Sequence, residues 1–138
     1  NDPIVPKQTS YARVVSGEMP ILLDYDFNAY RAKYSEKGNF EFVIPCEGSV
    51  VFPYVVGLVK NAPDKEKAKK VSDYLLSDKG QATWTNAYLR PARQIELPEA
   101  VKKKFLPDAD YARARTVDWG QMEGMQKGFV DRYLAEVR

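Results

Sequence analysis

Two carboxylates and two aromatic rings stand together at residues 24–27, which read Asp24, Tyr25, Asp26 and Phe27. They directly follow the apolar run PILL at residues 20–23. Aromatic rings beside carboxylates line many small-molecule pockets, where the rings cover apolar or cationic groups and the acids fix orientation. Aspartates at the start of a helix can equally accept bonds from backbone donors. The segment is therefore a candidate ligand-binding loop, with helix capping as the alternative.

A second candidate is the turn Glu47, Gly48 and Ser49. Gly48 allows an unusual backbone dihedral, and Glu47 is placed where its carboxylate could point into a cleft. The alternative is a solvated turn carboxylate. Further along, Arg90 and Arg93 could hold an anionic group, but arginines near a helix C-terminus are already favoured by the helix dipole.

The chain has no histidine and a single cysteine, Cys46. A histidine-based triad, metal site or general base therefore cannot be assembled from it. One cysteine also excludes an internal disulfide, and nothing near it in the sequence marks it as reactive. We expect no catalytic residue and no metal ligand, although carboxylates, lysines and tyrosines remain available.

Size and charge limit the other classes of function. With 138 residues, 44% of them hydrophobic, the chain has enough material for one domain or a piece of a larger one. Its 21 Lys and Arg against 19 Asp and Glu give a net charge of only +2, which does not favour nucleic acid or an anionic membrane. The longest apolar stretch, VVFPYVVGLV, is interrupted by Pro53 and is about half the length of a transmembrane helix.

The elements that would position these residues alternate between helix and strand in the first third of the chain. We expect a helix ending at residues 11–15 with Gly17 as its cap, a strand at 20–23, a helix from Asp26 or Asn28 to Gly38, and a strand at 40–44. This is a βαβ-like order.

The remaining elements are mostly helical. A strand at 49–59 should have a bulge, a sheet edge or a break at Pro53, and a helix should follow with Asp64 as its cap. Asp78 is the expected cap of the next helix, and the last helix should open at Asp118. Glycines at 120, 124 and 128 suggest that another backbone approaches that last helix closely.

Four separated motifs occur in an order and spacing that resemble a known family: SGEMPILLDY, VIPCEGS, GLVKNAPDKEKAKKVSDYLLSDKGQATW and RPAR. Together they resemble the C-terminal part of an extracellular solute-binding protein of an ABC importer, in the iron, polyamine, thiamine and phosphonate group. The resemblance implies an α/β chain that is the C-terminal portion of a two-lobed, type II periplasmic-binding fold, lacking the N-terminal half. It places residues 1–44 in the second lobe, residues 45–60 in a hinge crossover and a strand returning to the first lobe, and residues 61–138 in the first lobe's C-terminal helices.

The resemblance also implies a function. It describes a non-enzymatic receptor, periplasmic or extracellular and lipid-anchored if Gram-positive, that captures a small solute between its lobes and delivers it to membrane permease subunits without a cofactor. It directs residues 24–27 and the turn 47–49 toward the cleft. Ferric members commonly place adjacent tyrosines in the first loop, whereas this chain has Asp26 and Phe27. Carboxylates with aromatics suit an organic cation such as a polyamine instead.

Two other classes of function stay open at the level of sequence. One is a carboxylate- or tyrosine-based enzyme domain on a related α/β scaffold, in which Glu47 would be needed for turnover. The other is an interaction module in which the glycine-spaced C-terminal helix docks a partner.

Overall fold

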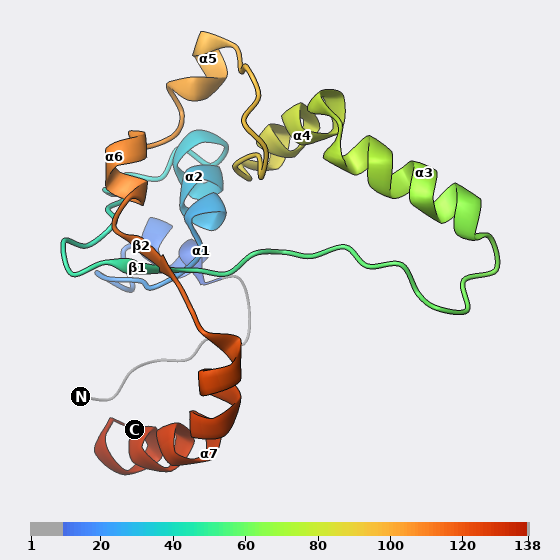
Figure 1. The fold of residues 1–138 in the computed structure, drawn as a ribbon. Coiled ribbons are helices and arrows are strands. Elements are labelled where there is room, and N and C mark those ends of the chain that lie inside the picture. Colours follow the sequence, from blue (N-terminus) through green and yellow to red (C-terminus); the bar gives the residue numbers. More distant parts are fainter. Residues whose placement is uncertain (1–9, 138) are drawn as a thin grey trace.

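A computed structural model describes residues 10–137 of the chain. A body built around α1 and α2 carries an arm formed by α3 and α4, and α7 projects from another side of the body, below it in the view of Figure 1. The elements are α1 (Tyr11–Val15), α2 (Asp26–Tyr34), β1 (Ser49–Val51), α3 (Lys65–Leu76), α4 (Asp78–Trp84), the 3₁₀ helix η1 (Thr85–Ala87), α5 (Glu99–Lys102), α6 (Asp108–Tyr111), β2 (Ala114–Thr116) and α7 (Trp119–Glu136). Residues 1–9 and 138, at the ends of the predicted segments 1–44 and 61–138, lie outside the described residues.

The described sheet consists of β1 and β2, which pair in parallel with Ser49 opposite Ala114 and Val51 opposite Thr116. β1 covers only residues 49–51 of the strand predicted at 49–59. It ends before Pro53, which has no N–H to donate to a ladder, and the strand predicted beyond Pro53 is wrong because residues 54–59 form none. β2 was not predicted, since its sequence lies in a polar connector.

The two other predicted strands are wrong. Residues 20–23 and 40–44 form no ladder, because no segment among residues 10–137 lies beside them to exchange backbone hydrogen bonds. Ile21 and Leu23 are accordingly 78% and 91% exposed. The alternation in residues 40–44 is nevertheless real, since Ile44 is buried while Val43 is 69% exposed.

The helix starts agree with the capping residues in the sequence, with one difference at α4. Asp64 accepts a 2.9 Å bond from the backbone N–H of Lys67, so the predicted cap is confirmed. Asp118, the predicted start of the last helix, is the N-cap of α7 and accepts a 3.1 Å bond from the backbone N–H of Gln121. The cap of α4 is Ser77 rather than Asp78. Ser77 is extended and its hydroxyl accepts from Gly80 N–H at 3.1 Å, whereas Asp78 is already helical.

The corner between α3 and α4 is held by Gly80 and Gln81. A Cβ atom on Gly80 would lie 2.0 Å from the carbonyl oxygen of Tyr74, so only glycine fits there. The buried Gln81 side chain donates to the Leu75 carbonyl at 2.8 Å and accepts from the Ala92 N–H at 2.7 Å. One amide therefore joins α3, α4 and the chain after η1.

The centre of the body is a hydrogen-bonded series through Tyr30, which is 2% exposed. The Leu106 N–H donates to the Tyr30 hydroxyl at 2.9 Å, and the hydroxyls of Tyr30 and Tyr111 are 2.5 Å apart. Tyr111 donates its proton to Asp26 Oδ2 at 3.1 Å, so Tyr30 is the donor between the two tyrosines. We call this set the tyrosine relay; it ties α2 to α6.

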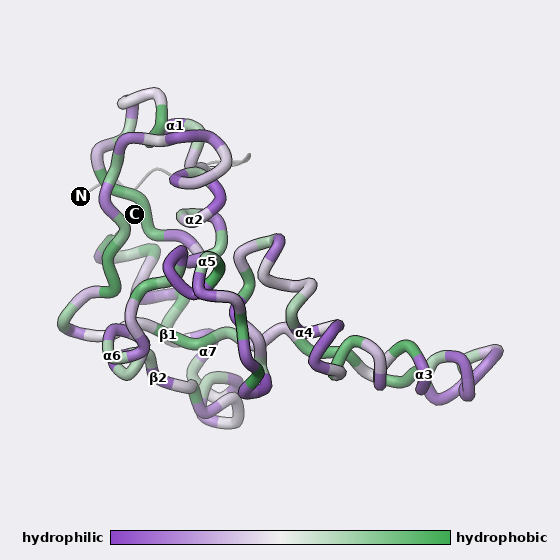
Figure 2. The backbone as a smooth tube through the Cα atoms, turned by 90° about the horizontal axis from the view of Figure 1, so that it is seen from above, coloured by the Kyte–Doolittle hydropathy of each residue, from purple (hydrophilic) through white to green (hydrophobic). Residues whose placement is uncertain are grey.

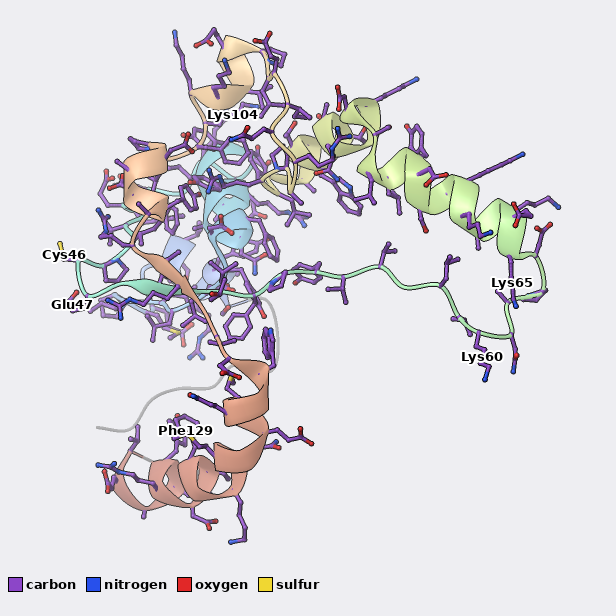
Figure 3. The ribbon with its side chains drawn as sticks, in the orientation of Figure 1. Cys46, Glu47, Lys60, Lys65, Lys104 and Phe129 are labelled. Carbon is purple, nitrogen blue, oxygen red and sulfur yellow. The ribbon has the colours of Figure 1, made fainter. Side chains whose placement is uncertain are left out.

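Much of the chain lies outside this core. The accessible surface is 11488 Å², against about 7300 Å² for a compact monomer of 15.7 kDa, an excess of about 4200 Å². The extended segment 52–60, the arm and α7 contribute exposed apolar side chains, among them Val55, Val71 and Phe129. Figure 2 shows the arm projecting from the body, and Figure 3 shows the side chains of α7 standing free around Phe129.

α7 has no buried residue, and a Cβ atom on Gly124 or Gly128 would meet nothing within 4 Å. The close approach of another backbone that these glycines suggested is therefore not made within residues 10–137. Along the same residues, no helix has the length and apolar character needed to cross a bilayer.

The tyrosine relay should dominate stability at neutral pH. Tyr111→Phe removes one donor to Asp26 and one acceptor for Tyr30, so we expect the free energy of unfolding to fall by about 1–3 kcal/mol. Urea denaturation followed by circular dichroism measures this. Tyr74→Phe is the matched control, because the Tyr74 hydroxyl has no hydrogen-bonding partner in the described part of the chain. Equal losses in both variants would contradict the role assigned to the relay.

The relay also predicts a dependence on alkaline pH. Burial raises the pKa of Tyr111 and that of Tyr30 above the ordinary value for tyrosine. Because the folded pKa values exceed those of the unfolded chain, this stabilisation is complete below a pH of about 10 and is lost as pH rises further. The free energy of unfolding should decline more steeply above that pH in the wild type than in the Tyr30→Phe/Tyr111→Phe double variant. Parallel declines would show that lysine deprotonation alone is responsible.

Candidate functional site

Asp24 organises the start of α2. Its Oδ1 accepts from the Tyr25 N–H at 2.7 Å and from Asn28 Nδ2 at 2.9 Å, and its Oδ2 accepts from the Ser10 hydroxyl at 2.9 Å. Tyr25 is the N-cap and makes no side-chain capping bond, so Asp24 supplies the carboxylate that holds the first turn. This is close to the capping role left open by the sequence, although the carboxylate remains exposed to solvent.

Asp26 is also engaged within the protein. Its Oδ1 accepts from the Phe27 N–H at 2.8 Å, and its Oδ2 ends the tyrosine relay at Tyr111. Asp26 is the first residue of α2, where a negative charge is favoured by the helix dipole. Its carboxylate thus links the candidate loop to the core of the body.

Three aromatic rings gather beside these carboxylates, and we call Tyr25, Phe27 and Tyr54 the aromatic cluster. The ring centroids are 5.3 Å apart for Tyr25 and Phe27, 6.3 Å for Tyr25 and Tyr54, and 6.2 Å for Phe27 and Tyr54. Such distances are typical of favourable aromatic pairs. Tyr54 comes from the extended segment after β1 and is 73% exposed, so the cluster presents ring surface to solvent.

Tyr54 was not among the predicted site residues. The available signal was the spacing of Val50, Phe52 and Tyr54 at every second residue, which directs side chains to one face of an extended chain. That spacing shows an aromatic face but not its contact with residues 25–27.

The predicted turn residues Glu47, Gly48 and Ser49 lie together in an open hollow of about 290 Å³, which also includes Arg115 and which we call the Arg115 hollow. Gly48 has φ +113°, and a Cβ atom there would lie 3.0 Å from the Arg113 carbonyl oxygen, so the expectation of an unusual glycine dihedral is confirmed. Glu47 is exposed and stands at the tip of the turn (Figure 3).

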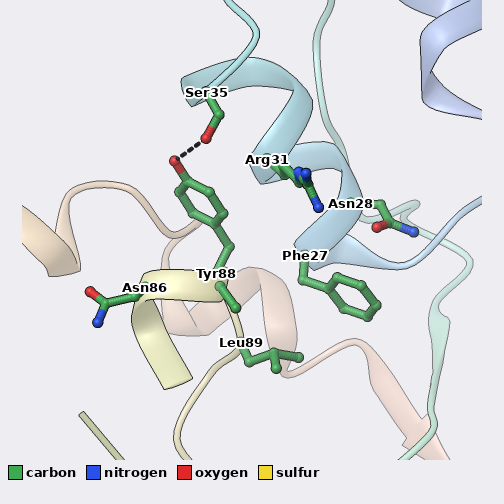
Figure 4. A pocket seen from close by; sticks show the side chains of 8 residues that line it. Phe27, Asn28, Arg31, Ser35, Asn86, Tyr88 and Leu89 are labelled. Atoms are coloured by element: carbon green, nitrogen blue, oxygen red, sulfur yellow. Dashed lines mark hydrogen bonds between the residues drawn. The ribbon is translucent and has the colours of Figure 1, made fainter. Parts of the chain in front are cut away.

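A second hollow of about 360 Å³ lies between α2 and residues 86–89 (Figure 4). We call it the Arg31 hollow; its lining is Phe27, Asn28, Arg31, Ser35, Asn86, Ala87, Tyr88 and Leu89. Of the seven predicted site residues, Phe27 is the one that lines it, and it belongs to the aromatic cluster as well. Arg31 and Tyr88 were not predicted, because the segments that line the hollow together are far apart in the sequence.

The structure therefore places the predicted site residues in two separate groups. Residues 24–27 surround the first turn of α2, whereas residues 47–49 line a different hollow. Arg90 and Arg93, the considered anion ligands, are paired with Asp108 at 2.6 Å and Asp78 at 3.2 Å. Within residues 10–137 no group of three or more histidine, cysteine, aspartate or glutamate side chains is arranged to hold a metal ion.

Comparison with known proteins gives one match. The family model of bacterial extracellular solute-binding proteins matches residues 1–123. Neither the curated proteins nor the solved structures contain a significant match to the chain.

The hydrogen bonds distinguish a carboxylate used in folding from one that is free. Asp24→Ala removes three accepted bonds at a helix start, so we expect the free energy of unfolding to fall by about 0.5–2 kcal/mol. Glu47→Ala, at an exposed carboxylate with no bonding partner in the described chain, should change it by less than about 0.5 kcal/mol. Urea unfolding of the two variants checks this. A larger loss for Glu47→Ala than for Asp24→Ala would contradict the assignment.

Proposed function

Because the chain belongs to the bacterial extracellular solute-binding proteins, we propose that it is part of the substrate-binding component of an ABC importer, one that delivers a small solute to membrane permease subunits. The identification of the family from sequence motifs is confirmed, and with it a non-enzymatic, solute-binding role in transport. The family implies a periplasmic-binding fold, and its extracellular character supports a location in the periplasm or outside the cell. A lipid anchor in a Gram-positive host belongs to the proposal.

The proposed architecture has two lobes. Residues 1–44 form part of the second lobe, residues 45–60 cross the hinge, and residues 61–138 supply helices of the first lobe. The tyrosine relay adds a refinement, because Leu106 and Tyr111 bond to α2. In this proposal residues 105–116 therefore return to the second lobe before α7 begins.

The exposed apolar surface supports the proposal that further polypeptide completes the first lobe. The excess of about 4200 Å², which counts the polar and apolar surface of the whole chain together, is several times the roughly 800 Å² that each partner buries in a standard interface. An exposed surface of this size is expected where part of a hydrophobic core is supplied by another segment of polypeptide. Segment 52–60 is extended and its backbone makes no ladder hydrogen bonds beyond Val51, while α3 exposes Val71 and Tyr74. A sheet supplied by an N-terminal half would pair with the segment and cover the helix.

We further propose that the solute carries an organic cation such as a polyamine. The observation that carries this is the aromatic cluster, whose three rings stand at the start of α2 beside the carboxylates of Asp24 and Asp26. Ring faces attract ammonium groups, and nearby carboxylates add charge pairing. Both carboxylates already accept hydrogen bonds, three at Asp24 and two at Asp26, but Asp24 is exposed whereas Asp26 is half-buried, so Asp24 is the better-placed direct partner.

Binding would be coupled to closure of the lobes. Only a closed state lets groups from both lobes touch one solute, so the solute shifts the population toward that state. Tyr54 stands on the segment that would cross between the lobes, and its ring already meets the rings of Tyr25 and Phe27. In this proposal the solute contacts the crossover segment through Tyr54 in the aromatic cluster.

The proposal is tested on the longer protein that contains this chain, by native mass spectrometry for a co-purified solute and by calorimetric titration with polyamines, phosphonates, thiamine, sugars and ferric chelates. For a polyamine, Tyr54→Ala should weaken binding about tenfold, since a cation–π contact and ring burial together supply on the order of 1–2 kcal/mol. Tyr133→Ala on α7, outside the aromatic cluster, is the matched control and should leave affinity unchanged.

The outcomes separate the parts of the proposal. Binding of another solute class with no polyamine binding would overturn the cation assignment and keep the receptor role. The absence of binding to every compound, with nothing co-purified, would contradict the receptor role itself.

A further inference from the structure

A second aromatic contact lies two residues before Tyr54 on the same extended segment. The ring centroids of Phe52 and Trp119 are 5.9 Å apart, with an angle of 55° between the ring planes. Alternate residues of an extended chain point to the same side, so Phe52 and Tyr54 project together. Phe52 therefore contacts the first residue of α7, while Tyr54 contacts the other two rings of the aromatic cluster.

The place of Trp119 is set by the elements that precede it. β2 pairs in parallel with β1, so that Thr116 lies opposite Val51. β1 continues directly into Phe52, and β2 leads through a short connection into α7 (Figure 1). Asp118 then caps the first turn of α7. The ladder and the contact between Phe52 and Trp119 thus form one continuous unit.

Beyond Phe52 the backbone does little to fix the segment. Pro53 has no N–H to donate, and residues 54–58 make no backbone hydrogen bond within residues 10–137. Tyr54 is also largely exposed. The direction of the Tyr54 side chain therefore depends on ring contacts at both sides of Pro53, one between Phe52 and Trp119 and one within the aromatic cluster.

The contact between Phe52 and Trp119 is a local one. The two residues are 47% and 54% exposed, so the contact covers only part of either side chain. Neither ring belongs to the buried core of the body. Removing the Trp119 ring should therefore affect the position of its neighbours more than the stability of the whole fold.

We infer that Trp119 is a positioning residue for Tyr54. The Trp119 ring holds Phe52 against the start of α7, and Phe52 in turn fixes the direction in which Tyr54 enters the aromatic cluster. α7 is thereby coupled to the site, although the family match ends at residue 123 and leaves most of this helix outside it.

The coupling works in both directions. Because coupling between two sites is reciprocal, a solute held by Tyr54 also acts on the contact between Phe52 and Trp119. The inference rests on the proposed function for the identity of its solute. The placing of Tyr54 by Trp119, in contrast, is a property of the free protein.

The first test follows the Tyr54 ring without any solute. The longer protein that contains this chain is prepared with 3-fluorotyrosine at position 54, whose ¹⁹F resonance reports the surroundings of the ring. Trp119→Ala should move the resonance toward its position in the urea-unfolded protein, and Trp119→Phe should restore most of the difference. Phe52→Ala removes the same contact and should act in the same direction. Trp84→Ala, at the similarly exposed second tryptophan, is the matched control and should leave the resonance in place.

The second test is calorimetric titration of the unlabelled longer protein with spermidine. Trp119→Ala should weaken binding about threefold to tenfold, the loss expected for one aromatic pair, while Trp84→Ala should leave affinity unchanged. In a Tyr54→Ala background, Trp119→Ala should cause no further weakening, because its effect passes through the Tyr54 ring. A residue that only stabilises the fold would weaken binding equally in both backgrounds. Circular dichroism checks that each variant is folded.

Two results would overturn the inference. One is a ¹⁹F resonance that Trp119→Ala leaves in place or that Trp84→Ala moves equally. The other is additive weakening by Trp119→Ala and Tyr54→Ala. Failure of the proposed function is recognised separately, because a protein that binds no spermidine contradicts the cation assignment while the ¹⁹F resonance still decides whether Trp119 positions Tyr54.

Discussion

The tyrosine relay is the interaction on which the arrangement of the body depends. By joining Tyr30 to Leu106 and Tyr111, it fixes residues from the C-terminal third of the chain against α2. Tyr111 is followed closely by Arg113, which donates to the carbonyls of Ile44 and Pro45 at 2.7 Å and 3.2 Å. β2 then begins and pairs with β1. The turn at residues 47–49 is thus positioned through contacts that start at one buried phenol.

The relay also changes the meaning of the acidic loop. Asp26 was predicted to bind a solute, yet its oxygens accept one hydrogen bond from the Phe27 N–H and one from the Tyr111 hydroxyl. Its charge therefore polarises a chain of hydroxyls that runs into the core, and a solute near the aromatic cluster would act on the same carboxylate. The Asp26 carboxylate therefore takes part both in the fold and in the proposed recognition of a solute. Asp24 and the rings of the cluster are the parts left on the surface.

The sequence predicts well those features that depend on residues a few positions apart, such as helix caps. Asp64 and Asp118 cap their helices because the donors they satisfy lie three residues away. The strands expected at 20–23 and 40–44 do not form, because a strand needs a partner that periodicity cannot supply. For the same reason the loop residues 24–27 could be singled out, whereas Tyr54 and Arg31 could not. Their neighbours come from segments distant in the chain.

The extended segment after β1 has a consequence for how the molecule must be handled. Residues 54–58 read YVVGL, carry no charge, and make no backbone hydrogen bond within residues 10–137. Such an edge is a template for any strand, including the same segment of a neighbouring molecule. Covering it is thus a condition for remaining monomeric at high concentration. Lys60, a little further along the chain, is the first charge that opposes stacking between copies.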